Sequence, residues 1–474
     1  MQSLHINALK VRNYRCFERL EIAFHPQLTV LVAENGAGKT AILDAVAVAL
    51  GPYVGAFDEA VGKNFSAADI RMLRVRETLS HEMEYASGGV ELEVEGCIPP
   101  LPDGSNHLQP VVWRRALSGP KKTKTTIKDA KQLISYGKRM QESARQSGTD
   151  VVLPLVAYYG TGRLWQQKKL TETKKIMNTS RTIGYTDCFD PASSYKSFEQ
   201  WFRYWSLNAA TARIKASEQG VAFWESEFDG YIESVASAVN ICLRLAGWRN
   251  VSYSFSREAL VAYHDELGEL PVEQLSDGIR NMIGLVADIA FRATKLNGHL
   301  GRDASRLTPG IVLIDEVDMH LHPGWQQTVL ADLLLAFPGM QFIVTTHSPQ
   351  VLSSVDCTSI RVLRKSTVDE GELAGWVDTV DMQTKGVSSA DVLAEIMHVA
   401  PVPDVAEARM LDDYHALIEQ NLHTHPDALA LREQLNAHFG SDHPLMHECD
   451  RLIRLQSYKQ RQPLRNNGNE QLDA

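Results

Sequence analysis

The chain of 474 residues carries 44% hydrophobic residues and a formal net charge of −10 at pH 7 with histidines counted as neutral. This length allows two or three domains, and the hydrophobic content is sufficient for buried cores. The acidic balance argues against a protein that coats nucleic acid over its whole surface, because such binding needs a broad positive surface. Contact with nucleic acid is therefore expected only through local basic patches.

The six cysteines are scattered, with no C-x-x-C pair, so reduced thiols are favoured over a zinc cluster or a disulfide framework. No stretch of about 18 apolar residues could span a bilayer, and the amino terminus lacks the apolar segment of a secretory signal. The sequence therefore predicts a cytoplasmic protein.

The first segments have strand character and end in a loop of small residues. "LHINALKV" alternates, "LEIAFH" follows a turn, and "LTVLVA" is a continuous apolar run of the kind found in a buried central strand. The loop "ENGAGKT" comes next, and "TAILDAVAVAL" then repeats apolar residues at helical spacing. Strand, loop and helix in this order form the context that a phosphate-binding loop requires.

This loop, residues 33–40, offers what a nucleoside triphosphate needs from a protein. Its small residues leave the backbone N–H groups open to phosphate oxygens at Asn35, Gly36 and Gly38. Lys39 would reach the β- and γ-phosphates, Thr40 would hold Mg²⁺, and the helix that starts there adds its positive dipole end. The usual G-x-x-x-x-G-K-[ST] pattern has glycine where this chain has Ala33, so the loop must begin in a conformation that alanine tolerates.

The middle of the chain contains further strands, a basic stretch and a helical insertion. Strand patterns recur at residues 88–117 and again from residue 251. The lysine-rich "SGPKKTKTTIKDAKQ" is better explained as a solvated loop entering a helix than as a nucleic-acid contact. Residues 193–247 carry aromatic and apolar residues at helical spacing, and their Trp/Phe stripe is expected to be core.

Two later strands end in polar residues that can perform chemistry. "GIVLI" delivers Asp315 and Glu316, and "QFIVTT" delivers His347. Both reach these residues at their carboxyl ends, where open α/β sheets bind ligands. Asp315 is assigned to the metal, Glu316 to polarising the attacking water, and His347 to contacting the γ-phosphate.

The loop "LSDGIRN", residues 275–281, precedes an apolar helix. Ser276 and Gly278 offer a hydroxyl, open backbone N–H groups and a helix dipole to an anion. Taken alone this is an N-cap with a turn. Taken with the other motifs it resembles the LSGGQ signature of ABC-type ATPases, with Asp277 and Ile279 as departures.

"LKVRNYRCF", "NGAGKT", "LSDGIRN", "IVLIDEVDMHLHP" and "VTTHSP" occur in the order seen in the SMC/RecF/OLD-like branch of ABC ATPases. The resemblance implies an α/β fold, an ATPase head with a mixed sheet and flanking helices that uses ATP and Mg²⁺. It also implies a head-to-head dimer in which Ser276 of one subunit faces Lys39 of the other. By the same resemblance Arg12 or Arg15 approaches the nucleotide, and "MHLHP" is the D-loop.

The longer strings "YYGTGRLW" and "CFDPASSYKSFEQWF" are similar to the PtuA family, the ATPases of Septu and certain retron anti-phage systems. This resemblance implies a defence ATPase that holds and regulates a separate HNH nuclease, PtuB, and in retrons also a reverse transcriptase with its RNA–DNA product. A RecF-like repair ATPase that acts directly on DNA through residues 121–131 is the alternative, and an ABC transporter subunit is a weaker one.

Four domains are expected along the chain. Residues 1–190 would form the N-terminal part of the ATPase head with the phosphate loop and a β-meander, and 191–250 the helical insertion. Residues 251–387 would complete the head, and 388–474 would form a helical extension that binds the partner protein.

Overall fold

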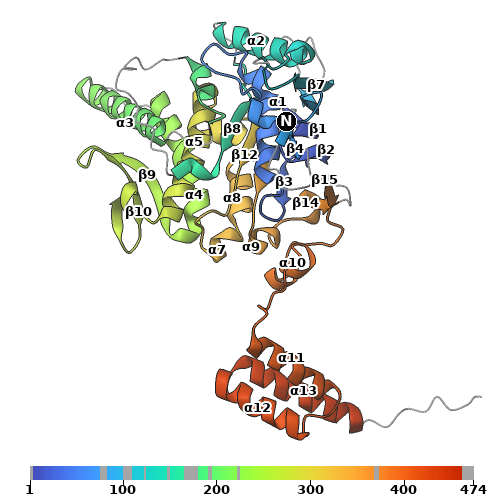
Figure 1. Ribbon diagram of the computed structural model, residues 1–474. Helices are drawn as coiled ribbons and strands as arrows, with labels where there is room; N and C mark the ends of the chain where they lie inside the picture. The colour runs from blue at the N-terminus through green and yellow to red at the C-terminus, as the bar shows by residue number, and fades with distance from the viewer. Residues whose placement is uncertain are drawn as a thin grey trace, which may run out of the picture. The chain divides into compact units, whose positions relative to one another are not determined.

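The computed structural model describes residues 4–74, 83–99, 109–121, 124–146, 150–164, 180–190, 195–220, 225–367 and 373–461. They belong to two compact units, Met1–Met397 and His398–Ala474, each with its own hydrophobic core. The first unit holds every β-strand of these described ranges, and the second consists of helices (Figure 1). None of the described helices is both long enough and apolar enough to cross a membrane.

A six-stranded mixed sheet forms the centre of the first unit. Its strand order is β15 (Leu373–Thr379), β14 (Ile360–Thr367), β3 (Leu28–Val32), β13 (Met340–Thr345), β12 (Gly310–Ile314) and β8 (Leu155–Tyr159). All neighbouring strands are parallel except β14 and β15. Every residue of β3, β8, β12 and β13 is buried, as in parallel sheets covered on both faces. The carboxyl ends of the parallel strands therefore meet at one edge of the sheet.

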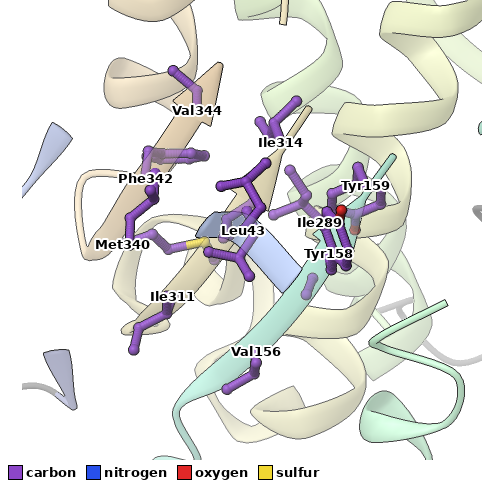
Figure 2. Close-up of a cluster of buried hydrophobic side chains, with 14 of the residues drawn as sticks. Leu43, Val156, Tyr158, Tyr159, Ile289, Ile311, Ile314, Met340, Phe342 and Val344 are labelled. Carbon is purple, nitrogen blue, oxygen red and sulfur yellow. The ribbon is translucent and has the colours of Figure 1, made fainter. Parts of the chain in front are cut away.

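Helix α1 (Lys39–Val54) packs between this sheet and a second one. All of its residues except Thr40 and Asp44 are buried. Figure 2 shows Leu43 of α1 in the core with side chains of β8, β12 and β13 and with Ile289 of α5 (Asp277–Leu296). On the opposite side, Trp113 of the second sheet donates its indole N–H to the Ala49 carbonyl oxygen at 2.9 Å. The helix that follows the phosphate loop is thus fixed on both sides.

The second sheet is antiparallel, with strand order β2 (Phe17–Ala23), β1 (His5–Tyr14), β6 (Val90–Ile98) and β7 (Gln109–Leu117). Buried and half-buried residues alternate along β6, which is the pattern of a sheet with one face on the core. Two smaller sheets complete the strands: β4 (Met72–Arg74) with β5 (Met83–Tyr85), and β9 (Trp248–Ser254), β10 (Ala259–His264) and β11 (Gly268–Pro271). The predicted α/β fold with a mixed sheet and flanking helices is confirmed.

The predicted helical insertion contains α3 (Tyr195–Glu218) and α4 (Glu227–Leu243). Phe198 and Phe202 of α3 are fully buried and Trp205 is 1% exposed. The Trp205 ring lies 5.6 Å from that of Phe291 in α5, measured between ring centroids. The aromatic stripe therefore packs α3 onto α5, and its prediction as core is confirmed.

The basic stretch runs through a 3-10 turn into α2 (Lys131–Arg145). Its described lysines are exposed at Lys121, Lys124, Lys128 and Lys131, whereas Lys122 lies outside the described residues. This arrangement agrees with a solvated loop entering a helix.

Short helices surround the sheet after α5: α6 (Ala304–Leu307), α7 (Pro323–Gln326), α8 (Val329–Ala336), α9 (Pro349–Leu352) and α10 (Ser389–Glu395). Helix α10 packs on α9, so the first unit continues to Met397. The second unit contains α11 (Ala406–Glu419), α12 (Pro426–Phe439) and α13 (Pro444–Arg461). These three helices enclose a small core of Tyr414, Ile418, Ala428, Leu435, Met446 and Cys449.

Candidate active site

The phosphate loop leaves the buried strand β3 and enters α1 at Lys39. The Lys39 side chain folds back over the loop, because its Nζ donates to the carbonyl oxygens of Ala33 at 2.9 Å and Glu34 at 3.2 Å. Asn35 and Gly36 are exposed. The backbone around them is therefore accessible to a ligand, while Lys39 itself is only 7% exposed.

Two glycines of this loop have the backbone conformation that favours glycine. Gly36 has φ 72° and Gly38 has φ 101°, whereas Ala33 does not have a positive φ. Alanine is therefore compatible with the first position of the loop, where the usual pattern has glycine.

Thr40 and Asp315, which are 275 positions apart in the sequence, are in direct contact. The Thr40 hydroxyl donates to Asp315 Oδ2 at 2.7 Å. Asp315 directly follows β12, is 4% exposed, and its backbone N–H donates to the Tyr159 carbonyl oxygen at 2.8 Å. The structure thus brings together a hydroxyl and a carboxylate, the kind of oxygen donors that suit Mg²⁺.

Glu316 and His347 follow neighbouring parallel strands. Ile314 of β12 lies opposite Val344 of β13, so the residues just beyond these two strands reach the same edge of the sheet. Glu316 has φ 50°, and its backbone N–H donates to the Thr345 hydroxyl at 2.7 Å. His347 is half-buried and precedes Ser348, the N-cap of α9.

The signature loop packs against the D-loop, residues 319–323. A Cβ atom added to Gly278 would lie 2.5 Å from the His320 carbonyl oxygen, so glycine permits this close approach. The Asn281 side chain donates to the Met319 carbonyl oxygen at 3.1 Å. Ser276 is the exposed N-cap residue of α5. Within one chain, Gly278 therefore has a packing function that the motif did not indicate.

The two candidate arginines occupy different environments. Arg12 is exposed on β1, in register with Arg19 of β2 and Glu91 of β6. Arg15 lies in the turn between β1 and β2, where its guanidinium bonds Asp44 of α1 at 2.7 Å and Asp69 at 2.9 Å. Of the two, Arg15 is the one tied to the helix that follows the phosphate loop.

A cluster of charged and aromatic groups lies beside this site. Asp44 also accepts from Lys63 Nζ at 2.5 Å, and that ammonium lies 4.9 Å from the ring centroid of Tyr158 in β8. Burial raises the pKa of the Tyr158 hydroxyl well above its usual value, and the carboxylates of Asp44 and Asp315 raise it further. Tyr158 therefore stays neutral, and the Asp44 carboxylate beside it is bonded by both Lys63 and Arg15.

Sequence reasoning did not identify Thr345, Asp44 or Lys63 as neighbours of the site. Thr345 had a detectable signal, since polar residues at the end of an apolar parallel strand must find buried partners. Asp44 carried a weaker signal as a charged residue within an otherwise apolar helix. Lys63 carried none, because it lies in a loop whose position depends on tertiary packing.

Two known protein families match the chain, and each match contains some of the ATPase motifs. Residues 8–219 match the family described as "AAA domain", and residues 257–353 match the family described as "AAA domain, putative AbiEii toxin, Type IV TA system". The first range contains the phosphate loop, and the second contains the signature loop, Asp315, Glu316 and His347. The chain is an ATPase with AAA-domain matches, and its motifs resemble those of the SMC/RecF/OLD-like branch.

The ATPase is similar to retron proteins over most of its length. It is 26% identical over 489 residues to the Retron Ec83 probable ATPase of Escherichia coli, covering 93% of this chain and 84% of that protein. It is 24% identical over 401 residues to the Retron Vc95 probable ATPase of Vibrio cholerae serotype O1 biovar El Tor, covering 76% and 74%. The Septu protein PtuA of Bacillus mycoides (strain KBAB4) is 42% identical over 92 residues, or 19% of this chain and 12% of that protein.

Replacing Gly38 with Ala is expected to lower the affinity of the ATPase for ATP by about tenfold or more. The φ of 101° is strained for alanine, and the new Cβ would lie 2.7 Å from Cys16 Sγ and collide with the Phe17 ring. Titration with a fluorescent ATP analogue measures the effect. The matched control is Gly119→Ala, because Gly119 has no positive φ and nothing in the described chain lies within 4 Å of its added Cβ. Equal affinities for both variants would show that the Gly38 conformation does not support binding.

Proposed function

We propose that this ATPase binds Mg²⁺–ATP at the carboxyl edge of its central sheet and hydrolyses it there. Asn35, Gly36, Gly38 and Lys39 hold the phosphates through backbone N–H groups and one ammonium. Thr40 and Asp315 would hold Mg²⁺, which would supply positive charge beside the phosphates. The contact between Thr40 and Asp315 at 2.7 Å carries this part of the proposal, because it joins the two motifs at one point.

Glu316 and His347 act on the reacting end of the nucleotide in this proposal. Glu316 orients the attacking water and accepts its proton, and His347 contacts the γ-phosphate. Arg12 is proposed to contact the nucleotide on the basis of the motif resemblance alone. Arg15 is the other candidate, and its bonds to Asp44 and Asp69 hold it near the start of α1.

A head-to-head dimer supplies the rest of the site. Ser276 and Gly278 of one subunit close on the ATP held by the other, where the α5 N-terminus offers N–H groups to the phosphates. The exposure of Ser276 at this helix end supports the arrangement. ATP binding and hydrolysis would then change which faces of the dimer are exposed.

We further propose that the ATPase is a subunit of a retron- or Septu-type anti-phage defence complex and that it regulates an HNH nuclease. Reverse transcriptase and its RNA–DNA product are additional partners in the retron version. The similarity to the two retron ATPases over 93% and 76% of the chain supports this reading over a RecF-like repair ATPase. The second unit, with its own core, is the proposed binding surface for the nuclease.

Removing the second unit is expected to abolish nuclease binding and leave ATP binding within about threefold of the full chain, because the nucleotide site lies within the first unit. The tagged full chain and a variant ending at Met397 are purified from the native operon, with and without ATP, and bound proteins and nucleic acid are identified. An HNH protein is expected to copurify with the full chain and not with the shortened one. If RNA–DNA copurifies as well, the complex is a retron.

Nuclease recovery with the shortened chain would refute the role of the second unit. If the full chain purifies without a nuclease and plain DNA stimulates its ATP hydrolysis, the repair alternative is correct instead.

A further inference from the structure

Strand β13 ends at Thr345, and the side chains of Thr345 and of the next residue, Thr346, are both completely buried. The preceding residues of this strand are also buried. A hydroxyl in such a place must bond to protein groups, because water does not reach it. The partners of these two hydroxyls therefore indicate why the strand carries polar residues here.

The Thr345 hydroxyl joins two residues that the proposed function places at the reacting centre. It donates to Asp315 Oδ1 at 2.6 Å and accepts from the Glu316 backbone N–H at 2.7 Å. The Thr345 carbonyl oxygen also accepts from the Val317 N–H at 3.0 Å. One residue of β13 thus contacts three consecutive residues that follow β12.

These bonds occupy the side of Asp315 that Thr40 leaves open. Thr40 bonds Oδ2 and Thr345 bonds Oδ1, so both carboxylate oxygens have a hydroxyl partner. The carboxylate plane is therefore fixed from α1 on one side and from β13 on the other.

The backbone of Glu316 has φ 50°, in the left-handed region that non-glycine residues seldom adopt, so this conformation must be stabilised by its neighbours. The bond from its N–H to Thr345 stabilises that conformation. Thr346 supports the same turn further along, since its hydroxyl donates to Asp318 Oδ1 at 2.5 Å and accepts from the Ser348 N–H at 3.0 Å. The two threonines connect the segment around His347 with the segment around Glu316.

We propose that Thr345 is a positioning residue for ATP hydrolysis, holding the Asp315 carboxylate and the Glu316 backbone in the geometry that the reaction needs. This inference rests on the proposed roles of Asp315 and Glu316. Thr345 is completely buried, and it acts by orienting the two residues assigned to the metal and to the attacking water, not through a bond of its own to the nucleotide.

The test compares Thr345→Val with Thr345→Ser. Valine removes both hydroxyl bonds at nearly the same size, so kcat is expected to fall by about tenfold or more, since small displacements of catalytic groups cost this much. The affinity for a fluorescent ATP analogue is expected to change by less than about threefold, because Lys39 and the loop around it are unchanged. Serine keeps the hydroxyl and is expected to restore kcat to within about threefold.

A matched control is Thr29→Val. Thr29 of β3 is also completely buried, and its hydroxyl accepts from the His25 N–H at 2.9 Å, away from Asp315 and Glu316. Its kcat is expected to match the wild type. If Thr345→Val does not fold, Thr345→Ala is compared with Thr345→Ser instead, since alanine leaves room for water beside Asp315.

The inference is overturned if Thr345→Val keeps the wild-type kcat, or if Thr345→Ser loses as much activity as valine. Glu316→Gln, measured in the same assay, separates this failure from a failure of the proposed function. If Glu316→Gln has a low kcat and Thr345→Val has the wild-type kcat, the role of Thr345 is refuted and the role of Glu316 is not. A Glu316→Gln that hydrolyses ATP at the wild-type rate refutes the catalytic assignment, and the role of Thr345 with it.

Discussion

Glu316→Gln is expected to lower the rate of ATP hydrolysis by about a hundredfold or more while leaving ATP bound. A positioned general base contributes at least this factor, and glutamine keeps the size of the side chain but cannot accept the proton of the attacking water. The phosphate loop and the contact between Thr40 and Asp315 are unchanged by the substitution. Phosphate release measured at saturating ATP gives kcat, and titration with a fluorescent analogue gives the affinity.

The same variant is expected to accumulate as a closed dimer, because ATP that is not hydrolysed keeps the two heads together. Light scattering after size-exclusion chromatography, with and without Mg²⁺–ATP, measures this shift. Lys39→Ala is the companion variant, and it should lose most of its ATP affinity and remain open. Normal turnover by Glu316→Gln would show that another group activates the water.

The phosphate loop could be predicted from sequence because its chemistry is local. Residues 28–54 contain an apolar strand, a loop of small residues and a helix, and short-range patterns determine all three. The placement of Asp315, Glu316 and His347 just after two strands could also be predicted, since "GIVLI" and "QFIV" are apolar runs typical of buried strands. That the two strands β12 and β13 are neighbours required the structure, because strand order depends on contacts between distant residues.

Roles that depend on close tertiary contacts were not predictable. Gly278 fits an anion site by its motif, yet its lack of a side chain also allows the His320 carbonyl oxygen to approach it. Arg12 and Arg15 are equivalent basic residues in the sequence, and only the positive φ of Arg15 and its bonds to Asp44 and Asp69 separate them. Such distinctions arise from backbone geometry and register.

The boundary between the two units also could not be predicted from the sequence. Helical periodicity begins near residue 388 and continues to the second unit, so a single extension from that point is the natural interpretation of the sequence. In the structure, α10 packs on α9 of the first unit, and the compact division falls after Met397. Periodicity identifies a helix but does not say which core the helix joins.

A buried ion pair joins helix α5 to the central sheet. Asp288 and Arg292 are 1% and 6% exposed, and Arg292 Nε lies 2.7 Å from Asp288 Oδ2. The Tyr159 hydroxyl of β8 donates to the same carboxylate oxygen at 2.7 Å. Arg292 Nη1 also donates to the carbonyl oxygens of Gly184 and Thr186, both at 2.9 Å. The pair thus connects α5, the edge strand of the sheet and the segment around residue 184.

Arg292→Met is expected to lower the free energy of unfolding of the first unit by about 3–5 kcal/mol, because it leaves the Asp288 carboxylate buried without its counter-charge. Adding Asp288→Asn is expected to recover about half of that loss or more, since the amide is neutral and its oxygen still accepts from Tyr159. Urea unfolding followed by tryptophan fluorescence reports the first unit alone, because all 8 tryptophans precede residue 398. A double variant as unstable as Arg292→Met would show that the bonds of Arg292 to Gly184 and Thr186, and not its charge, stabilise the fold.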